Sequence, residues 1–214
     1  MSDTTLEPNG PSAFVQEAYE LDDQKDMVEF YRKWAEDYDH QMMVELEYES
    51  PTRIAEMLSQ FQNKSASVLD IGCGTGLTGL SLHNLGFECI DGIDLSPDMI
   101  GVAGQRGIYR DLMVGDLNLP LDIDDVCYDA IISSGTFTHG HVGSDPIDEV
   151  LRVLKPGGMI ACTVHKALWE TRGFKQKFET LQVSKAISCL MLEEGQYFTN
   201  GELEGWFCVY RKSE

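Results

Sequence analysis

Hydrophobic positions in the first quarter of the chain follow a helical period. Phe30, Trp34 and Tyr38 recur every four residues, which predicts a helix with one apolar stripe starting near residue 26. A second helix is expected to begin at Ser50, because serine suits the N-cap position and Pro51 suits the first helical position. The N-terminal part is therefore expected to be helical.

After residue 64 the pattern changes to short apolar runs that alternate with helical segments. The runs that predict strands are SVLDIG, FECIDGID, YRDLMVGD, CYDAIISSG and MIACTVH, followed by SCLMLEEGQYF and GWFCVYRKS around the turn sequence TNGELEG. Helices are expected in TGLTGLSLHNLG, ending at Gly86; from Ser96 and Pro97 to about Gln105; from Ser144-Asp145-Pro146 to the sequence KPGG; and around 173–186. The last two strands are expected to form an antiparallel hairpin.

Repeated strand–helix–strand units with short apolar strands are typical of a parallel sheet that helices cover on both faces. Right-handed crossovers then predict an α/β fold with a doubly wound, mostly parallel seven-stranded sheet that ends in the antiparallel hairpin. Ligands bind such sheets beyond the carboxyl ends of the strands. Residues 1–25 are polar and acidic, so we expect a flexible N-terminal arm followed by a single domain over residues 26–214.

Four glycines follow the first strand in the sequence VLDIGCGTGLTG, residues 68–79. A phosphate-binding P-loop requires a lysine after its last glycine, and none follows here. Gly74, Gly76 and Gly79 match the dinucleotide-binding string G-x-G-x-x-G, but they lie too late, because the turn already begins at Gly72. The match in register is Asp70-x-Gly72-x-Gly74-x-Gly76.

This turn, in the sequence VLDIGCGTG, resembles motif I of the class I S-adenosylmethionine-dependent methyltransferases. The resemblance extends, in that family's order and spacing, through GIDLSPDMI, GDLNLPL, YDAIISSGTFTH and LRVLKPGG, and it covers about residues 28–165. The leader FYRKWAEDYD is similar to that of the small type 11/25 group, which includes the Williams–Beuren-region methyltransferase-like protein. The resemblance implies a Rossmann-like fold, the cofactor S-adenosyl-L-methionine, the product S-adenosyl-L-homocysteine and a helical lid at residues 26–62.

The resemblance also implies cofactor-binding roles for residues at the strand ends. Glycines lack a Cβ atom, so the turn can approach the methionine part of the cofactor, while Asp70 holds its cationic end. Asp94 accepts from the ribose hydroxyls, and Asp116 accepts from the adenine amino group. The complete predicted cofactor set is Tyr31, Tyr38, Asp70, Gly72, Cys73, Gly74, Gly76, Asp94, Leu95, Met99, Asp116, Leu117, Ser133 and Ser134.

Several of these residues also have a purely structural interpretation. Asp94 and Asp116 could be solvated turn residues, and Ser96 is expected to cap a helix rather than to contact a ligand. The N-terminal aromatic stripe is typical of core packing, whereas the resemblance places Tyr31 and Tyr38 in the cofactor lid.

The net charge of −20 limits the expected partners. Such a surface repels phosphate backbones and anionic membranes, so nucleic acid is disfavoured and a small-molecule acceptor is expected. No apolar run approaches the roughly 18 residues that span a bilayer. The six cysteines form no Cys-x-x-Cys pair, and most lie in apolar stretches, which is typical of reduced, buried thiols in a cytoplasmic protein. The oligomeric state is not indicated.

Methyl transfer to a hydroxyl or a protonated nitrogen benefits from a general base. His139 and His141, in the sequence FTHGHVG after the fourth strand, are the candidates, although each could equally be a surface histidine. Two histidines alone do not form a metal site, so no metal is expected. Cys162 and His165, in the fifth strand, are expected to belong to the core rather than to a nucleophilic pair.

The expected function is methyl transfer from S-adenosylmethionine to a small molecule, with an oxygen nucleophile favoured, by in-line displacement. The fourth strand lacks the Asn-Pro-Pro-Tyr/Phe sequence of enzymes that methylate amino groups of nucleobases or glutamine. Trp169, Arg172 and Phe174 either line the acceptor site or simply pack. The alternatives are a non-catalytic protein-interaction module that keeps the cofactor fold, and an NAD-dependent oxidoreductase that binds ribose through Asp94.

Overall fold

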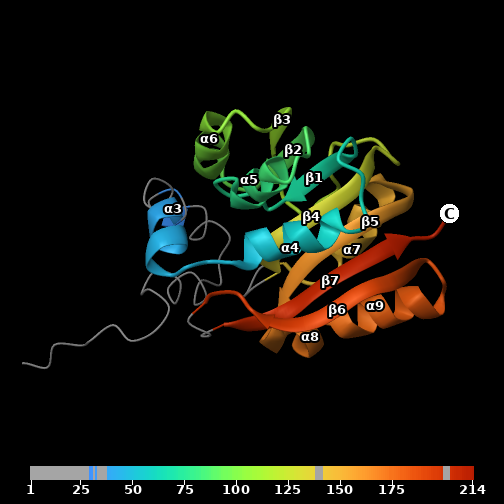
Figure 1. Ribbon diagram of the computed structural model, residues 1–214. Helices are drawn as coiled ribbons and strands as arrows, with labels where there is room; N and C mark the ends of the chain where they lie inside the picture. Colours follow the sequence, from blue (N-terminus) through green and yellow to red (C-terminus); the bar gives the residue numbers. More distant parts are fainter. Residues whose placement is uncertain (1–28, 31, 33–37, 138–141, 200–202) are drawn as a thin grey trace, which may run out of the picture.

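The computed structural model describes residues 29–30, 32, 38–137, 142–199 and 203–214 (Figure 1). The elements along the chain are α3 (Tyr38–His40), the π-helix η1 (Gln41–Glu45), α4 (Ser50–Ser59), β1 (Ser67–Ile71), α5 (Leu77–Asn84), β2 (Cys89–Asp94), α6 (Pro97–Gln105), β3 (Asp111–Val114), β4 (Tyr128–Phe137), α7 (Pro146–Val153), β5 (Leu154–His165), α8 (Lys166–Thr171), α9 (Phe174–Val183), β6 (Ile187–Gln196) and β7 (Glu204–Lys212). Within these ranges, no helix is both long and apolar enough to cross a membrane.

Seven strands form one sheet in the order β3-β2-β1-β4-β5-β7-β6 (Figure 1). Strands β1 to β5 are parallel, and β7 runs antiparallel to both β5 and β6. The prediction of a doubly wound, mostly parallel sheet with an antiparallel C-terminal hairpin is therefore confirmed. The strand order reverses between β1 and β4, and folds of this type bind ligands beyond the carboxyl ends of the strands at that point.

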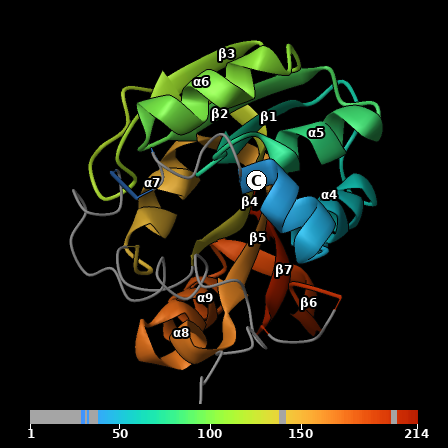
Figure 2. The same cartoon turned by 90° about the vertical axis from the view of Figure 1, so that its left-hand side faces the viewer.

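The strands separate two hydrophobic cores, because successive side chains point to opposite faces of a sheet. Val68 and Ile132 face the core in which α4 packs, whereas Leu69 and Ile131 face the core of α7 and α9. Figure 2 shows α4 and α5 on one side of the sheet and α7 and α8 on the other. Alternate residues along β1 or β2 therefore have their side chains in different cores.

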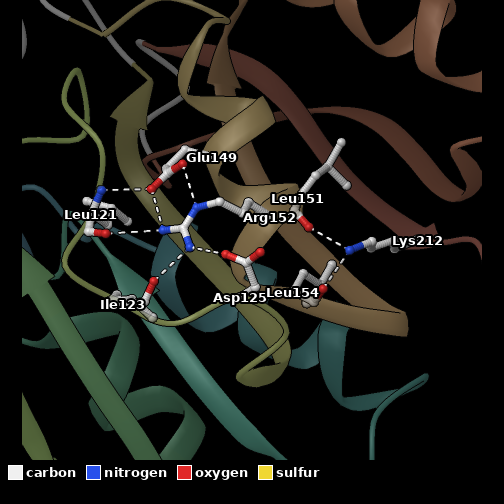
Figure 3. Close-up of polar contacts among 8 residues, drawn as sticks. All are labelled: Leu121, Ile123, Asp125, Glu149, Leu151, Arg152, Leu154 and Lys212. Carbon is white, nitrogen blue, oxygen red and sulfur yellow. Dashed lines mark hydrogen bonds and ion pairs between the residues drawn. The ribbon is translucent and has the colours of Figure 1, made fainter.

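The loop between β3 and β4 is held onto α7 by Arg152 (Figure 3). Its guanidinium donates to the carbonyl oxygens of Leu121 (3.1 Å) and Ile123 (2.8 Å), and it forms ion pairs with Glu149 and Asp125. Glu149 also accepts from the Leu121 N–H (2.7 Å). A long connection that has little regular structure thus gains a defined position against α7, just before the start of β4.

The structure corrects three local expectations. Ser50 is the first residue of α4 rather than its N-cap, and its hydroxyl bonds to Ser134 Oγ (2.8 Å). Strand β3 ends two residues before Asp116, which lies in the following loop. Helix α8 was not predicted, because it follows β5 without a loop; His165 caps it by accepting from the Ala167 N–H (3.2 Å).

All six cysteines are free thiols. Cys73, Cys162 and Cys208 are buried, Cys89 is partly buried, and Cys127 and Cys189 are exposed. The prediction of unpaired cysteines is confirmed, whereas the expected burial holds for only half of them. The two exposed thiols lie directly before β4 and in β6, where one end or one face of the sheet is open to solvent.

Candidate functional site

The turn between β1 and α5 has a backbone that glycine adopts easily. Gly72, Gly74 and Gly76 have φ angles of +65°, +53° and +92°. A Cβ atom at Gly72 would lie 2.1 Å from Thr136 Oγ1, and one at Gly76 would lie 2.9 Å from the Tyr109 ring. Nothing lies within 4 Å of a Cβ atom at Gly74. The first and third glycines therefore serve packing, while the space beside Gly74 is open to a ligand.

Four N–H groups of this turn are used within the protein. Gly72 and Cys73 donate to a carbonyl oxygen of β2 (2.8 and 3.1 Å), and Gly76 donates to the carbonyl oxygen of Cys73 (2.8 Å). The Gly74 N–H donates to Asp94 Oδ2 (2.8 Å). Phosphate-binding turns point such N–H groups at the anion instead. These four donors are therefore not available to a pyrophosphate, which argues against the dinucleotide alternative.

Asp70, near the carboxyl end of β1, is fully buried. Its Oδ2 accepts from the Tyr109 hydroxyl (2.8 Å), while Oδ1 has no hydrogen-bond partner in the described part of the chain. Burial raises the pKa of Asp70 to about 7; the bond from Tyr109 lowers this pKa, and the charge of Asp94 raises it. A buried carboxylate oxygen without a donor suits a ligand that brings a cationic or N–H group to it.

Asp94, the last residue of β2, is held by backbone N–H groups. Its Oδ1 accepts from Ser96 and its Oδ2 from Gly74, both at 2.8 Å. Burial raises the pKa of Asp94, and these backbone bonds act in the opposite direction. A carboxylate has about four acceptor positions, so a hydrogen-bonded Asp94 can still accept from a diol. The Ser96 hydroxyl accepts from the Met99 N–H (3.3 Å), which confirms its predicted role as a helix cap.

The other predicted cofactor contacts on this side lie along the same edge of the sheet. Cys73 is buried beneath the turn, and burial raises the pKa of its thiol. Leu95 is half-buried, and Leu117 is buried. Asp116 Oδ1 accepts from the backbone N–H (2.9 Å) and the side-chain amide (3.1 Å) of Asn118, as a turn aspartate does.

Ser133 and Ser134 have different partners because they point to opposite faces of β4. Ser133 is fully buried, and its hydroxyl donates to the carbonyl oxygen of Ile71 (2.9 Å). Ser134 Oγ bonds to Ser50 Oγ (2.8 Å) and to the Tyr48 hydroxyl (3.2 Å). Ser133 therefore joins β4 to β1, whereas Ser134 belongs to a hydroxyl cluster with two residues of the N-terminal segment.

The N-terminal segment contacts the glycine turn through Asp39 of α3. The Asp39 carboxylate accepts from Thr75 Oγ1 (2.6 Å) and forms an ion pair with Arg106. Arg106 Nε in turn donates to the carbonyl oxygen of Thr75 (2.6 Å). Tyr38 is half-buried and packs against the core on the α4 side of the sheet. A segment far from the turn in sequence thus borders it in the fold.

Sequence reasoning missed Tyr109, Asp39 and Arg106. For Tyr109 a signal was present: Gly79 and Gly92 lie on neighbouring elements, and a Cβ atom at either would collide with or crowd the tyrosine. Glycine in a helix interior and in a strand interior is unfavourable without such a reason. For the ion pair, no local pattern was available.

Three predicted residues lie outside the described residues: Tyr31, His139 and His141. Among the residues that the structure does describe, no group of three or more His, Cys, Asp or Glu side chains is placed to hold a metal ion.

The residues assigned to either the core or the acceptor site can also be placed. Cys162 and His165 are buried, as expected of core residues. Trp169 and Phe174 are buried among aromatic rings, whereas Arg172 is exposed. The two aromatic side chains therefore serve packing.

Comparison with known proteins identifies relatives over much of the chain. Residues 68–158 match the family described as "methyltransferase domain". Human methyltransferase-like protein 27 is 36% identical over 155 residues, which cover 71% of this chain and 62% of that protein. The bovine 18S rRNA (guanine-N(7))-methyltransferase is 36% identical over 91 residues, which cover 42% of this chain and 32% of that protein. The matches thus span less than two thirds of either relative.

A solved structure shows the same fold at lower sequence identity. It is a candidate S-adenosyl-L-methionine-dependent methyltransferase from Methanococcus maripaludis, with a TM-score of 0.62 and 19% identity. The superposition covers 86% of this chain and 94% of that one. The fold is therefore shared over nearly the whole of that protein.

Proposed function

We propose that this chain, as a member of the class I S-adenosylmethionine-dependent methyltransferases, transfers a methyl group from S-adenosylmethionine to a small-molecule acceptor. One observation carries the choice of ligand: the Asp70 carboxylate is fully buried, and its Oδ1 has no partner within the described ranges, beside a turn whose N–H groups are largely used internally. This combination fits a ligand with a cationic end and no phosphate.

The residues at the sheet edge have the chemistry that this cofactor requires. We assign the cationic methionine end to Asp70, the close approach to Gly74, the ribose diol to Asp94, and the adenine to Asp116 and Leu117. When bound, the cofactor supplies a methyl group on a positively charged sulfur. The protein's part is to hold two reactants aligned and away from water, and such orientation can lower a barrier by about 7–11 kcal/mol.

For the acceptor we propose an oxygen nucleophile on a small molecule. Several relatives are named as rRNA or tRNA methyltransferases, but the net charge of −20 opposes binding of an RNA backbone. The hydroxyl cluster of Tyr48, Ser50 and Ser134 supplies neutral polar groups at the end of β4, which suit an uncharged acceptor. His139 or His141 is the proposed general base, because the sequence places both just after this strand.

Thermal unfolding with S-adenosylhomocysteine tests the cofactor assignment. A ligand at 100 times its dissociation constant adds about 2.7 kcal/mol to the free energy of unfolding, so the melting temperature should rise measurably. NAD at the same concentration should leave it unchanged. Asp94→Ala should abolish the rise, whereas Asp98→Ala, at an exposed position in the first turn of α6, should retain it. A rise with NAD alone would overturn the proposal.

Release of S-adenosylhomocysteine tests the acceptor. The wild-type protein is incubated with S-adenosylmethionine and either a panel of hydroxylated metabolites or total RNA. We expect turnover with a member of the panel, and a loss of about 100-fold or more in rate when the histidine that acts as base is replaced by alanine. Turnover with RNA alone would contradict a small-molecule acceptor. Cofactor binding without turnover on either would favour the non-catalytic module.

A further inference from the structure

Tyr109 occupies a space that three glycines leave free. These are Gly76 in the turn, Gly79 in α5 and Gly92 in β2. Added Cβ atoms there would lie 2.9 Å from the tyrosine ring, 2.2 Å from its hydroxyl oxygen and 3.1 Å from its ring, respectively. Glycine in the interior of a helix is unfavourable relative to alanine, so Gly79 needs a reason. The tyrosine hydroxyl that lies against it supplies that reason.

The hydroxyl that these glycines accommodate donates to the buried Asp70 carboxylate. The bond to Oδ2 is 2.8 Å long, and Oδ1 is the oxygen for which the described residues supply no partner. Burial, followed by the charge of Asp70, raises the pKa of Tyr109, so its hydroxyl keeps its proton and remains a donor. Besides Tyr109, the groups that face Asp70 are the Cys73 thiol of the turn, the Asp94 carboxylate of β2 and the Gly79 backbone of α5.

We propose that Tyr109 is a positioning residue for the cofactor: it orients the Asp70 carboxylate with Oδ1 toward the cationic methionine end, and its hydrogen bond favours the charged form of that carboxylate. The inference rests on the proposed function. A hydrogen bond donated to a carboxylate stabilises its charged form. Without it, burial and the Asp94 charge both favour the protonated acid, which attracts a cation far less.

Calorimetric titration of S-adenosylhomocysteine between pH 5.5 and 8.5 tests this role with a readout that does not depend on activity. Wild-type affinity should rise as pH increases through the pKa of Asp70, about 7, because the carboxylate binds the ligand's ammonium group. In Tyr109→Phe the midpoint of that rise should move up by about one pH unit, and affinity at pH 7 should fall by about 3–10-fold. Asp70→Asn should give a weak affinity with a flat profile.

The protein contains a matched control. The Tyr128 hydroxyl also donates to a buried aspartate, Asp91, at the same 2.8 Å. Tyr128→Phe should lower stability and leave the pH profile of binding unchanged. Gly79→Ala perturbs the Tyr109 contact from its other side, since the new methyl group would lie 2.2 Å from the hydroxyl. It should raise the midpoint as Tyr109→Phe does, and it replaces that variant if Tyr109→Phe does not fold.

The outcomes separate the two proposals. If the wild type binds S-adenosylhomocysteine, and Tyr109→Phe and Gly79→Ala show the same pH midpoint as the wild type, the role of Tyr109 is overturned and the proposed function stays intact. A uniform loss of affinity at every pH counts against the proposal in the same way, because purely structural damage produces it. A wild type that does not bind S-adenosylhomocysteine at any pH would overturn both.

Discussion

Asp70 and Asp91 lie on neighbouring strands, and each accepts a hydrogen bond from a tyrosine hydroxyl at 2.8 Å. Asp91 also forms an ion pair with Arg110, whose Nε donates to it at 2.9 Å. Among the described side chains and backbone groups, Asp70 faces no cation and its Oδ1 has no hydrogen-bond partner. Both carboxylates are almost fully buried, so burial does not distinguish them.

The difference arises from the pleat of the sheet. Asp91 lies opposite Leu69 in the pairing of β1 with β2, and Asp70 lies opposite Gly92, so the two carboxylates face different cores. On the α7 side the protein supplies a cation and completes the pair. On the α5 side it leaves one oxygen for a ligand. An incompletely compensated buried charge is therefore a better marker of a binding site than burial or charge alone.

Removing the compensated carboxylate should have the largest effect on stability. Asp91→Ala leaves the buried Tyr128 hydroxyl without its acceptor and Arg110 without its partner. We expect a loss of about 2–4 kcal/mol in the free energy of unfolding. This loss is smaller than the one expected on breaking a fully buried ion pair, because the Arg110 side chain is 56% exposed to solvent. Urea denaturation measures it. A loss below about 1 kcal/mol would show that solvent replaces the pair.

Removing the uncompensated carboxylate of Asp70 should instead raise the free energy of unfolding above pH 7. The pKa of Asp70 is about 7 in the folded protein and about 3.9 in the unfolded chain. Between these values the folded state holds the proton more tightly, so the free energy of unfolding falls as pH rises from about 4 to 7. Asp70→Asn has no charge to bury.

We therefore expect Asp70→Asn to be more stable than the wild type at pH 8 by about 1–3 kcal/mol, with little difference at pH 4. Thermal unfolding at both pH values measures this. The same variant should lose S-adenosylhomocysteine affinity, so stability and binding move in opposite directions. Destabilisation at pH 8 would mean that Asp70 is compensated in the free protein, and the contrast with Asp91 would disappear.

Features that depend on local rules could be predicted from the sequence. The order of strands and helices follows from the hydrophobic period, and the turn follows from its glycines. The Ser96 cap could be predicted because its donor, the Met99 N–H, lies only three residues further along the chain. The sequence does not distinguish the three glycines that it predicts to contact the cofactor; only the structure shows that Gly74 has open space beside it.

Features that depend on contacts between distant segments could not be predicted. Tyr109 and Asp70 are 39 residues apart, and Arg106 and Asp39 are 67 residues apart. Ser50 failed as a predicted cap because Ser134, 84 residues away, bonds its hydroxyl instead. Sequence propensity describes how a side chain interacts with the backbone close to it in the chain. At these positions, contacts made in the folded structure determine the hydrogen-bond partner instead.

A smaller effect on stability is expected from Gly74→Ala. Its φ of +53° strains an L-residue by about 1 kcal/mol or more, but nothing lies within 4 Å of the new methyl group. Gly86→Ala is the matched control, since Gly86 has a φ of +93° and equally open space, beyond the end of α5 that is opposite to the turn. Both variants should lose similar stability, and only Gly74→Ala should lose affinity for S-adenosylhomocysteine, by about tenfold or more. Equal affinities would mean that the ligand does not approach this backbone.

The smallest effect is expected from a third carboxylate, Asp39, whose charge is compensated more than that of Asp70 and less than that of Asp91. Asp39 has a cation, Arg106, but its side chain is 36% exposed, so water screens the pair. Asp39→Asn keeps an oxygen that can accept from Thr75 and removes only the charge. We expect a loss of at most about 0.5 kcal/mol in stability and of about two- to threefold in S-adenosylhomocysteine affinity, because α3 is then held less firmly against the turn.

Salt separates this effect from general damage. Raising the ionic strength to about 1 M shortens the screening length to about 3 Å, so the affinity of the wild type should fall toward that of Asp39→Asn, which should itself change little. Calorimetric titration at low and high salt measures both. If the two proteins keep a constant ratio of affinities, the ion pair does not hold α3, and the hydrogen bond from the Thr75 hydroxyl to Asp39 is the contact that joins the N-terminal segment to the site.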